Sequence, residues 1–169
     1  MRLNKYLKGR RGMTLIELTI VIAISGILIV GILKLFQTSS DIWTSSLHSI
    51  AIQQKGRTAL EEITRFVRQS TSPVTGISPA IGGTSSSLKF AFMKDTSTIV
   101  NMEYFKSGSA LYRVSGNSTS TLIENYVDSI YFKHVSSYVV TIETFTLTKG
   151  TGKNQKTLTF ERTINIRNR

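Results

Sequence analysis

Cysteine is absent from this 169-residue chain, and proline is rare. Without cysteine the chain forms no disulfide and offers no thiolate to a metal or a substrate. This absence leaves the redox compartment open, because an exported domain can fold without disulfide bridges. Neither of the two prolines precedes Pro73, so no proline interrupts helix formation in the first 72 residues.

Patterns typical of catalysis and metal binding are also missing. His48 and His134 are the only histidines, and they do not have the H-x-x-x-H spacing of a zinc site. The sequence contains no P-loop, no glycine-rich dinucleotide motif between strand and helix, and no G-x-S-x-G elbow. We therefore predict that the chain is not an enzyme, that both histidines are structural, and that no metal or cofactor is bound.

The chain does have a concentrated apolar segment near its N-terminus. Residues 18–33 read LTIVIAISGILIVGIL without a charge, and Glu17 is the one charged residue in the 21 residues 13–33. As a helix, such a stretch spans about 31 Å, close to the roughly 30 Å hydrocarbon core of a bilayer. We expect residues 13–36 to form a single transmembrane helix.

Positive charge precedes this apolar segment. The first 12 residues carry five of the 21 Lys and Arg, and no acid occurs before Glu17. The positive-inside rule therefore places residues 1–12 in the cytoplasm and the chain after about Gln37 outside it. A secretory signal peptide would end in a small-residue cleavage site, whereas KLF follows here at residues 34–36. The segment is expected to stay on the chain as an anchor.

Gly12 and Glu17 are the two residues that a plain signal anchor would not need. They lie in RRGMTLIELTIVIAISGIL, where a basic peptide ends in glycine and a glutamate is the fifth residue of the apolar segment that follows. This order resembles the leader of type IV prepilins. The resemblance implies cleavage between Gly12 and Met13 by prepilin peptidase and N-methylation of Met13 by the same enzyme. Members of that family more often have Phe at the position of Met13.

Both residues also have a local interpretation. Glycine lets a chain leave helical geometry, so Gly12 alone would indicate only a helix break. Thr14 and Glu17 fit the Ser/Thr-x-x-Glu capping box that starts a helix. A carboxylate within the membrane is costly and indicates a functional site with a partner. The prepilin resemblance identifies that partner as the Met13 amine of a neighbouring subunit, and the two roles of Glu17 are compatible.

Downstream of the apolar segment, residues 37–69 are predicted to form an amphipathic helix. Apolar residues recur at spacings of three and four; they are Trp43, Leu47, Ile50, Ala51, Ala59, Leu60, Ile63, Phe66 and Val67. We expect this helix to continue the transmembrane helix, with a new N-cap at residues 38–41 as the alternative. Residues 70–87 are rich in Ser, Thr, Gly and Pro, which predicts a surface loop.

The remaining sequence alternates as strands do. Strands are predicted at residues 88–92, 100–104, 110–114, 130–135, 138–148 and 157–166. Residues 106–109 suit a hairpin turn, and a change of apolar parity between Ile142 and Phe145 predicts a bulge or two short strands. A helix packed on such an antiparallel sheet gives an α+β fold, which the pilin resemblance also implies. Residues 70–169 would then be an extracytoplasmic loop and sheet region.

Four later stretches suggest which kind of pilin this is. RTALEEITRFVRQS, ALYRV, LIENYVDSIYF and TINIRN are similar to parts of larger minor pilins and pseudopilins, the W type of type IV pili and the J type of type II secretion systems. The resemblance implies a structural subunit that assembles through its N-terminal helix. Its partners would be other pilins or pseudopilins, the inner-membrane assembly platform and membrane lipid. Pilus, secretion and competence roles are not separated by the sequence.

Two other hypotheses stay open. The formal net charge is +11. After residue 148 the sequence has one acidic residue, Glu161, and six basic residues, which are Lys149, Lys153, Lys156, Arg162, Arg167 and Arg169. A competence pilin that binds DNA would use such a region. Against DNA binding, Phe160 is the one aromatic residue in this stretch and no base-reading module is present. An unrelated signal-anchored sensor or binding module would keep its leader and would not need Glu17.

Overall fold

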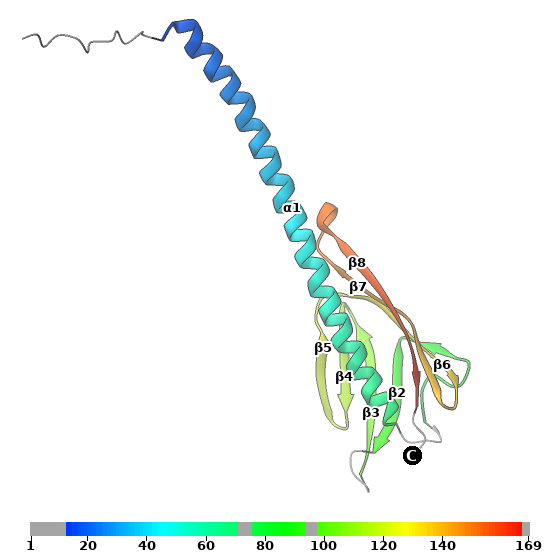
Figure 1. Cartoon of the computed structure of the whole chain (residues 1–169). Helices are drawn as coiled ribbons and strands as arrows, with labels where there is room; N and C mark the ends of the chain where they lie inside the picture. Colours follow the sequence, from blue (N-terminus) through cyan, green and yellow to red (C-terminus); the bar gives the residue numbers. More distant parts are fainter. Residues whose placement is uncertain (1–12, 71–75, 94–97, 167–169) are drawn as a thin grey trace, which may run out of the picture. The chain divides into compact units, whose positions relative to one another are not determined.

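The computed structural model describes residues 13–70, 76–93 and 98–166. Within these ranges the chain forms one long helix, α1 (Leu15–Arg68), the short 3-10 helix η1 (Gly152–Asn154) and eight β-strands (Figure 1). The chain divides into two compact units, unit 1 (Met1–Ile42) and unit 2 (Trp43–Arg169). Each unit is considered by itself below.

In unit 1 the described residues are the two that precede α1 and the N-terminal half of this helix. Every side chain from Met13 to Ile42 is exposed, and α1 is the one helix of the described residues that is long and apolar enough to span a membrane. The Thr38 hydroxyl donates a 3.0 Å hydrogen bond to the Lys34 carbonyl within the helix. No new N-cap forms at residues 38–41, so the prediction of one continuous helix is confirmed.

Unit 2 contains two four-stranded antiparallel sheets. The first has the order β2-β3-β4-β5, and its strands are β2 (Ser87–Met93), β3 (Ile99–Ser107), β4 (Ala110–Ser115) and β5 (Ser118–Ile123). The second has the order β1-β6-β7-β8, and its strands are β1 (Thr84–Ser85), β6 (Val127–Ser136), β7 (Val139–Lys149) and β8 (Lys156–Asn165). Together with α1 these sheets give the expected α+β, pilin-like arrangement.

Several local predictions agree with the strands. The hairpin between β3 and β4 turns at Gly108, whose φ of +59° suits glycine. The register of β7 against β8 shifts between Ile142 and Phe145, which confirms the predicted bulge. Three features were not predicted: β5, the division of the strands into two sheets, and the short strand β1, which lies in the predicted loop 70–87.

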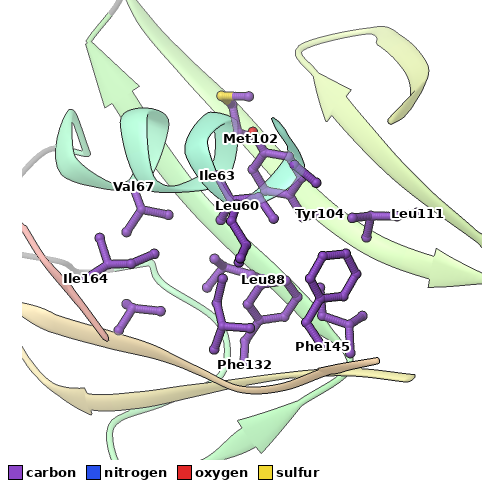
Figure 2. Packing of buried hydrophobic residues seen from close by; sticks show 14 of the residues in the cluster. Leu60, Ile63, Val67, Leu88, Met102, Tyr104, Leu111, Phe132, Phe145 and Ile164 are labelled. Carbon is purple, nitrogen blue, oxygen red and sulfur yellow. The ribbon is translucent and has the colours of Figure 1, made fainter. Parts of the chain in front are cut away.

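One hydrophobic core joins α1 to both sheets. Figure 2 shows Leu60, Ile63 and Val67 of α1 above side chains from the two sheets. The largest fully buried side chains of the core are Tyr104, Phe132, Phe145, Ile52, Ile63, Leu88, Leu111, Ile123, Ile130, Ile142, Leu147 and Ile164. Burial of this apolar area is the main force that holds α1 to the strands.

Not all of the helically spaced apolar residues of α1 are buried. Ile52 is fully buried, whereas Trp43, Leu47 and Ile50 keep 68%, 48% and 50% of their surface exposed. The helical spacing of these three residues therefore does not reflect packing on the sheets. Spacing alone does not distinguish two apolar faces of a helix, and the sheets cover the face of Ile52 and Gly56.

A hydrogen-bonded cluster also ties α1 to the first sheet. Arg113 Nη1 of β4 donates a 2.8 Å hydrogen bond to Glu62 Oε1 and forms a salt bridge with this carboxylate. The Tyr104 hydroxyl donates to the same oxygen over 3.5 Å. Burial, together with the nearby Glu62 charge, raises the pKa of Tyr104 and keeps its hydroxyl protonated as a donor. The cluster therefore links Glu62 of α1 to β3 and β4.

The loop before β2 is less solvated than predicted. Ile77 is buried, and the bridge between Ser78 and Lys89 attaches the loop to β2. His134 of β6 is also buried, and its Nδ1 lies 3.0 Å from the Pro79 carbonyl oxygen. The described part of the loop therefore packs on the sheets, and His134 holds it there.

Gly56 permits the close approach of α1 to the second sheet. A Cβ atom at this position would lie 2.5 Å from two ring atoms of Phe160 in β8 and 3.2 Å from Leu147 in β7. Phe160 itself packs on Phe145 with ring centroids 5.9 Å apart. Phe160 is half-buried, so a side chain at position 56 fits only if this ring shifts.

Gly56→Val is therefore expected to lower the free energy of unfolding by about 1–3 kcal/mol, the usual cost of overpacking a core. Denaturant unfolding of the detergent-solubilised full chain, followed by the circular dichroism of its strands, measures this change. Arg57→Val is the matched control, because Arg57 is exposed and the same side chain there costs about 0.5 kcal/mol in helix propensity. Equal stability of the two variants would show that Phe160 yields at no cost.

Candidate processing and assembly site

The start of α1 is a complete capping box. Glu17 Oε2 accepts hydrogen bonds from the Thr14 main-chain nitrogen at 2.8 Å and from the Thr14 hydroxyl at 3.1 Å. The Glu17 main-chain nitrogen donates to Thr14 Oγ1 at 3.3 Å. The first helical hydrogen bond follows directly, from Leu18 N to Thr14 O at 3.2 Å. Thr14 and Glu17 thus satisfy donors that a helix start leaves free.

The cap uses only one carboxylate oxygen of Glu17. Both Thr14 hydrogen bonds end on Oε2, and among the described residues no hydrogen bond reaches Oε1. A carboxylate oxygen can accept more than one donor, so Oε1 can receive a second cation or N–H group. Capping within the chain and pairing with another chain therefore do not compete for the same atom.

The surroundings of Glu17 are apolar. Met13, Leu15 and Ile16 keep 67%, 81% and 66% of their surface exposed. Gly12 lies outside the described residues, so the predicted scissile bond is described only on its Met13 side. Within the described part of the chain, the structure brings Thr14 and Glu17 together and places Met13 immediately before the cap.

The basic region predicted near the C-terminus is divided in the structure. Lys149 ends β7, Lys156 begins β8 and Lys153 lies in η1 on the turn between them, whereas Arg162 lies farther along β8. Two residues that sequence reasoning did not connect with this turn, Lys55 of α1 and Tyr126, belong to the same surface. The Lys55 and Lys149 ammonium nitrogens lie 4.8 and 4.9 Å from the centroid of the Tyr126 ring.

No arrangement typical of an enzyme is found among the described residues. They contain no group of three or more His, Asp or Glu that could hold a metal ion. A depression of about 510 Å³ is open to solvent over the β7 bulge, and it is lined by Thr141, Ile142, Glu143, Thr144, Glu161, Arg162 and Thr163. Its Glu143 is already paired with Lys133 at 2.7 Å.

Comparison with known proteins bears on the N-terminal segment. Residues 7–33 match the prokaryotic N-terminal methylation motif. The match includes Gly12, Met13 and Glu17 and most of the apolar run. Comparisons with curated proteins and with solved structures gave no match. The methylation motif, followed by the long apolar helix α1, fits a type IV prepilin-like protein.

Proposed function

We propose that the chain is a minor structural subunit of a type IV pilus, a competence pseudopilus or a type II secretion pseudopilus. The observation that carries this proposal is the methylation motif at residues 7–33, with Glu17 placed at the start of a long apolar helix. The likeness of four later stretches to W-type pilins and J-type pseudopilins supports a minor role. Proteins of the prepilin-like family are structural, so the proposal includes no reaction performed by the chain.

The proposed route begins in the cytoplasmic membrane. Residues 1–12 stay in the cytoplasm because they carry five positive charges and no acid. Residues 13–36 span the bilayer, and the region after residue 36, which includes all of unit 2, is extracytoplasmic. Prepilin peptidase then cleaves between Gly12 and Met13 and methylates the new amino group of Met13.

Assembly would follow from the charge of Glu17. An unpaired carboxylate is unfavourable in an apolar surrounding, and the Met13 amine of a neighbouring subunit offers a positive partner there. The free Oε1 atom of Glu17 is the acceptor that such an amine would reach. Other pilin or pseudopilin subunits and the inner-membrane assembly platform are the partners that this step requires.

The proposal is tested by producing the chain in cells that contain a pilus or pseudopilus assembly system, with and without prepilin peptidase. We expect the chain in sheared filaments or in crosslinked pseudopilus complexes only when the peptidase is present. Protease added to spheroplasts should digest unit 2, because this unit faces outward. A chain that stays unassembled in membranes containing the peptidase and all other subunits would contradict the proposal.

DNA capture by a competence pilin is the second candidate function. The observation that favours it is the meeting of Lys55 and Lys149 at Tyr126, beside two further lysines of the β7–β8 turn. Nucleic-acid phosphates and other phosphate groups would be attracted by the same charges. The experiment at the end of the next subsection separates these ligands.

A further inference from the structure

The turn between β7 and β8 concentrates positive charge. Residues 149–156 read KGTGKNQK, with three lysines and no acid. Lys153 and Lys156 are exposed, and Lys149 is half-buried. Within the described residues no salt bridge reaches any of the three, although other lysines of unit 2 are paired. Lysines without a nearby acid attract external anions to this turn.

The turn is fixed on α1 by His48. The Nδ1 atom of His48 lies 3.1 Å from the main-chain oxygen of Asn154, a hydrogen bond in which the ring N–H donates. Gly150 has a φ of +90°, and a Cβ atom there would lie 2.6 Å from His48 Nδ1. The lysines therefore lie on a turn that is held against the helix and not on a free loop.

Two further residues extend the charged surface. The ammonium nitrogens of Lys55 and Lys149 are both within cation–π distance of Tyr126, at 4.8 and 4.9 Å from its ring centroid. Thr148 N donates a 2.8 Å hydrogen bond to Tyr126 O, which holds the tyrosine beside the turn. Two like charges around one ring repel each other, and an external anion would reduce this repulsion. We call Lys55, Tyr126, Lys149, Lys153 and Lys156 the basic turn surface.

Exposed apolar residues also lie on α1, shortly before His48. Trp43 and Leu47 precede His48 by five positions and one position, and they keep 68% and 48% of their surface exposed. Tryptophan is enriched where a membrane meets water, because its ring is apolar and its N–H is polar. A lysine-rich surface and an exposed tryptophan in the same unit are a combination that fits a lipid headgroup region.

Chain connectivity keeps Trp43, the first residue of unit 2, near the membrane. Trp43 follows Phe36, the last residue of the proposed transmembrane segment, by seven positions. Even fully extended, seven residues cover only about 25 Å. Trp43 therefore stays within reach of the bilayer surface whatever the arrangement of the two units.

We propose that the basic turn surface binds the phosphates of anionic phospholipid headgroups on the extracytoplasmic face of the membrane that anchors the chain. This inference rests on the proposed single-span anchoring. Lipid phosphates are favoured over DNA because Tyr126 is half-buried and is contacted by Lys55 and Lys149, so it offers no free ring on which a base could stack. Binding would hold unit 2 at the bilayer before the subunit enters a filament.

The absence of cysteine allows a direct test on the full chain. Thr151→Cys places a single labelling site at the exposed tip of the turn. The labelled chain is reconstituted in nanodiscs of phosphatidylcholine alone or with one third phosphatidylglycerol, each with an acceptor dye on a lipid headgroup. We expect energy transfer to be about twofold higher in the anionic discs and to fall as salt screens the lysines.

The combined variant Lys149→Gln, Lys153→Gln and Lys156→Gln should lose this lipid-dependent rise. The matched control removes three charges elsewhere on unit 2, with Arg68→Gln, Lys106→Gln and Arg162→Gln, and should keep it. The single variant Lys153→Gln should lose part of the rise. Because Lys153 is exposed, this variant keeps the test valid even if the triple variant misfolds. Equal transfer in both lipid compositions, or equal loss in the control, would overturn the proposal.

Duplex DNA added to the phosphatidylcholine discs distinguishes the other phosphate ligand. DNA binding that needs the same three lysines, without any rise in the anionic discs, would assign the surface to nucleic acid and overturn the lipid proposal. Co-elution of the chain with the discs tests the anchoring separately. A chain that fails to co-elute would contradict the single-span anchor, and the surface proposal would fail with it.

Discussion

Gly12→Val is expected to leave residues 1–12 on nearly all of the chain in membranes that contain a prepilin peptidase. Glycine has no Cβ atom, so a protease can approach the backbone closely at this position and the chain can adopt non-helical geometry there. A β-branched side chain removes both properties. Intact-mass analysis should find the parent chain without residues 1–12 and with one added methyl group, and the variant with its leader and no methyl group.

Gly9→Val provides a matched control, because it introduces the same side chain in the same leader three positions earlier. Its leader should be removed as in the parent chain. Cleavage of the Gly12 variant at the parent rate, or retention of the leader in every chain including the parent, would contradict processing after Gly12. The first outcome would leave Gly12 as an ordinary helix break, and the second would favour an uncleaved signal anchor.

Features that depend on neighbours in sequence were predictable. The capping box requires only that Thr14 and Glu17 be three positions apart, and the structure forms all of its hydrogen bonds. The bulge in β7 follows from a change of parity within one strand, and it lies at Ile142 and Phe145 as expected. Local spacing determines these features because the atoms involved are close in any chain that forms the element.

Features that depend on distant partners were not predictable. The sequence of β5, STSTLI, is mostly polar, and of its six residues three are exposed and only Ile123 is buried. The division into two sheets depends on which strands pair, and pairing is not encoded in the alternation of a single strand. Lys55 lies in α1, Tyr126 in the connection between β5 and β6, and Lys149 in β7, so no local signal could have connected them.

The exposed face of α1 shows a further limit of periodicity. Trp43, Leu47 and Ile50 have helical spacing, but they lie on a face that the sheets leave uncovered. Apolar spacing indicates that a helical face meets an apolar or interfacial surrounding, and it does not identify that surrounding. The same sequence signal therefore fits a protein core and a membrane interface.

Glu17→Gln is expected to leave insertion, folding and cleavage after Gly12 intact and to reduce incorporation into filaments or pseudopilus complexes by about tenfold or more. The amide oxygen of Gln can replace Oε2 as the acceptor for Thr14 in the cap. Its NH₂ group would then occupy the place of Oε1, and it would present a neutral donor where the amine of a neighbouring subunit needs a negative acceptor. A loss of only 1.4 kcal/mol in this pairing is already about tenfold, and charges interact strongly in an apolar surrounding.

Thr14→Val separates the two roles of Glu17, because it removes the capping hydroxyl and leaves the carboxylate charged. If the charge acts in assembly, the Thr14 variant should be incorporated normally and the Glu17→Gln variant poorly. If Glu17 only caps its own helix, the order should be reversed, because Gln replaces Glu well in a capping box while valine offers no acceptor. Quantification of both variants in sheared or crosslinked assemblies, relative to their amounts in the membrane, decides between these outcomes. Normal incorporation of Glu17→Gln would leave helix capping as the role of this carboxylate.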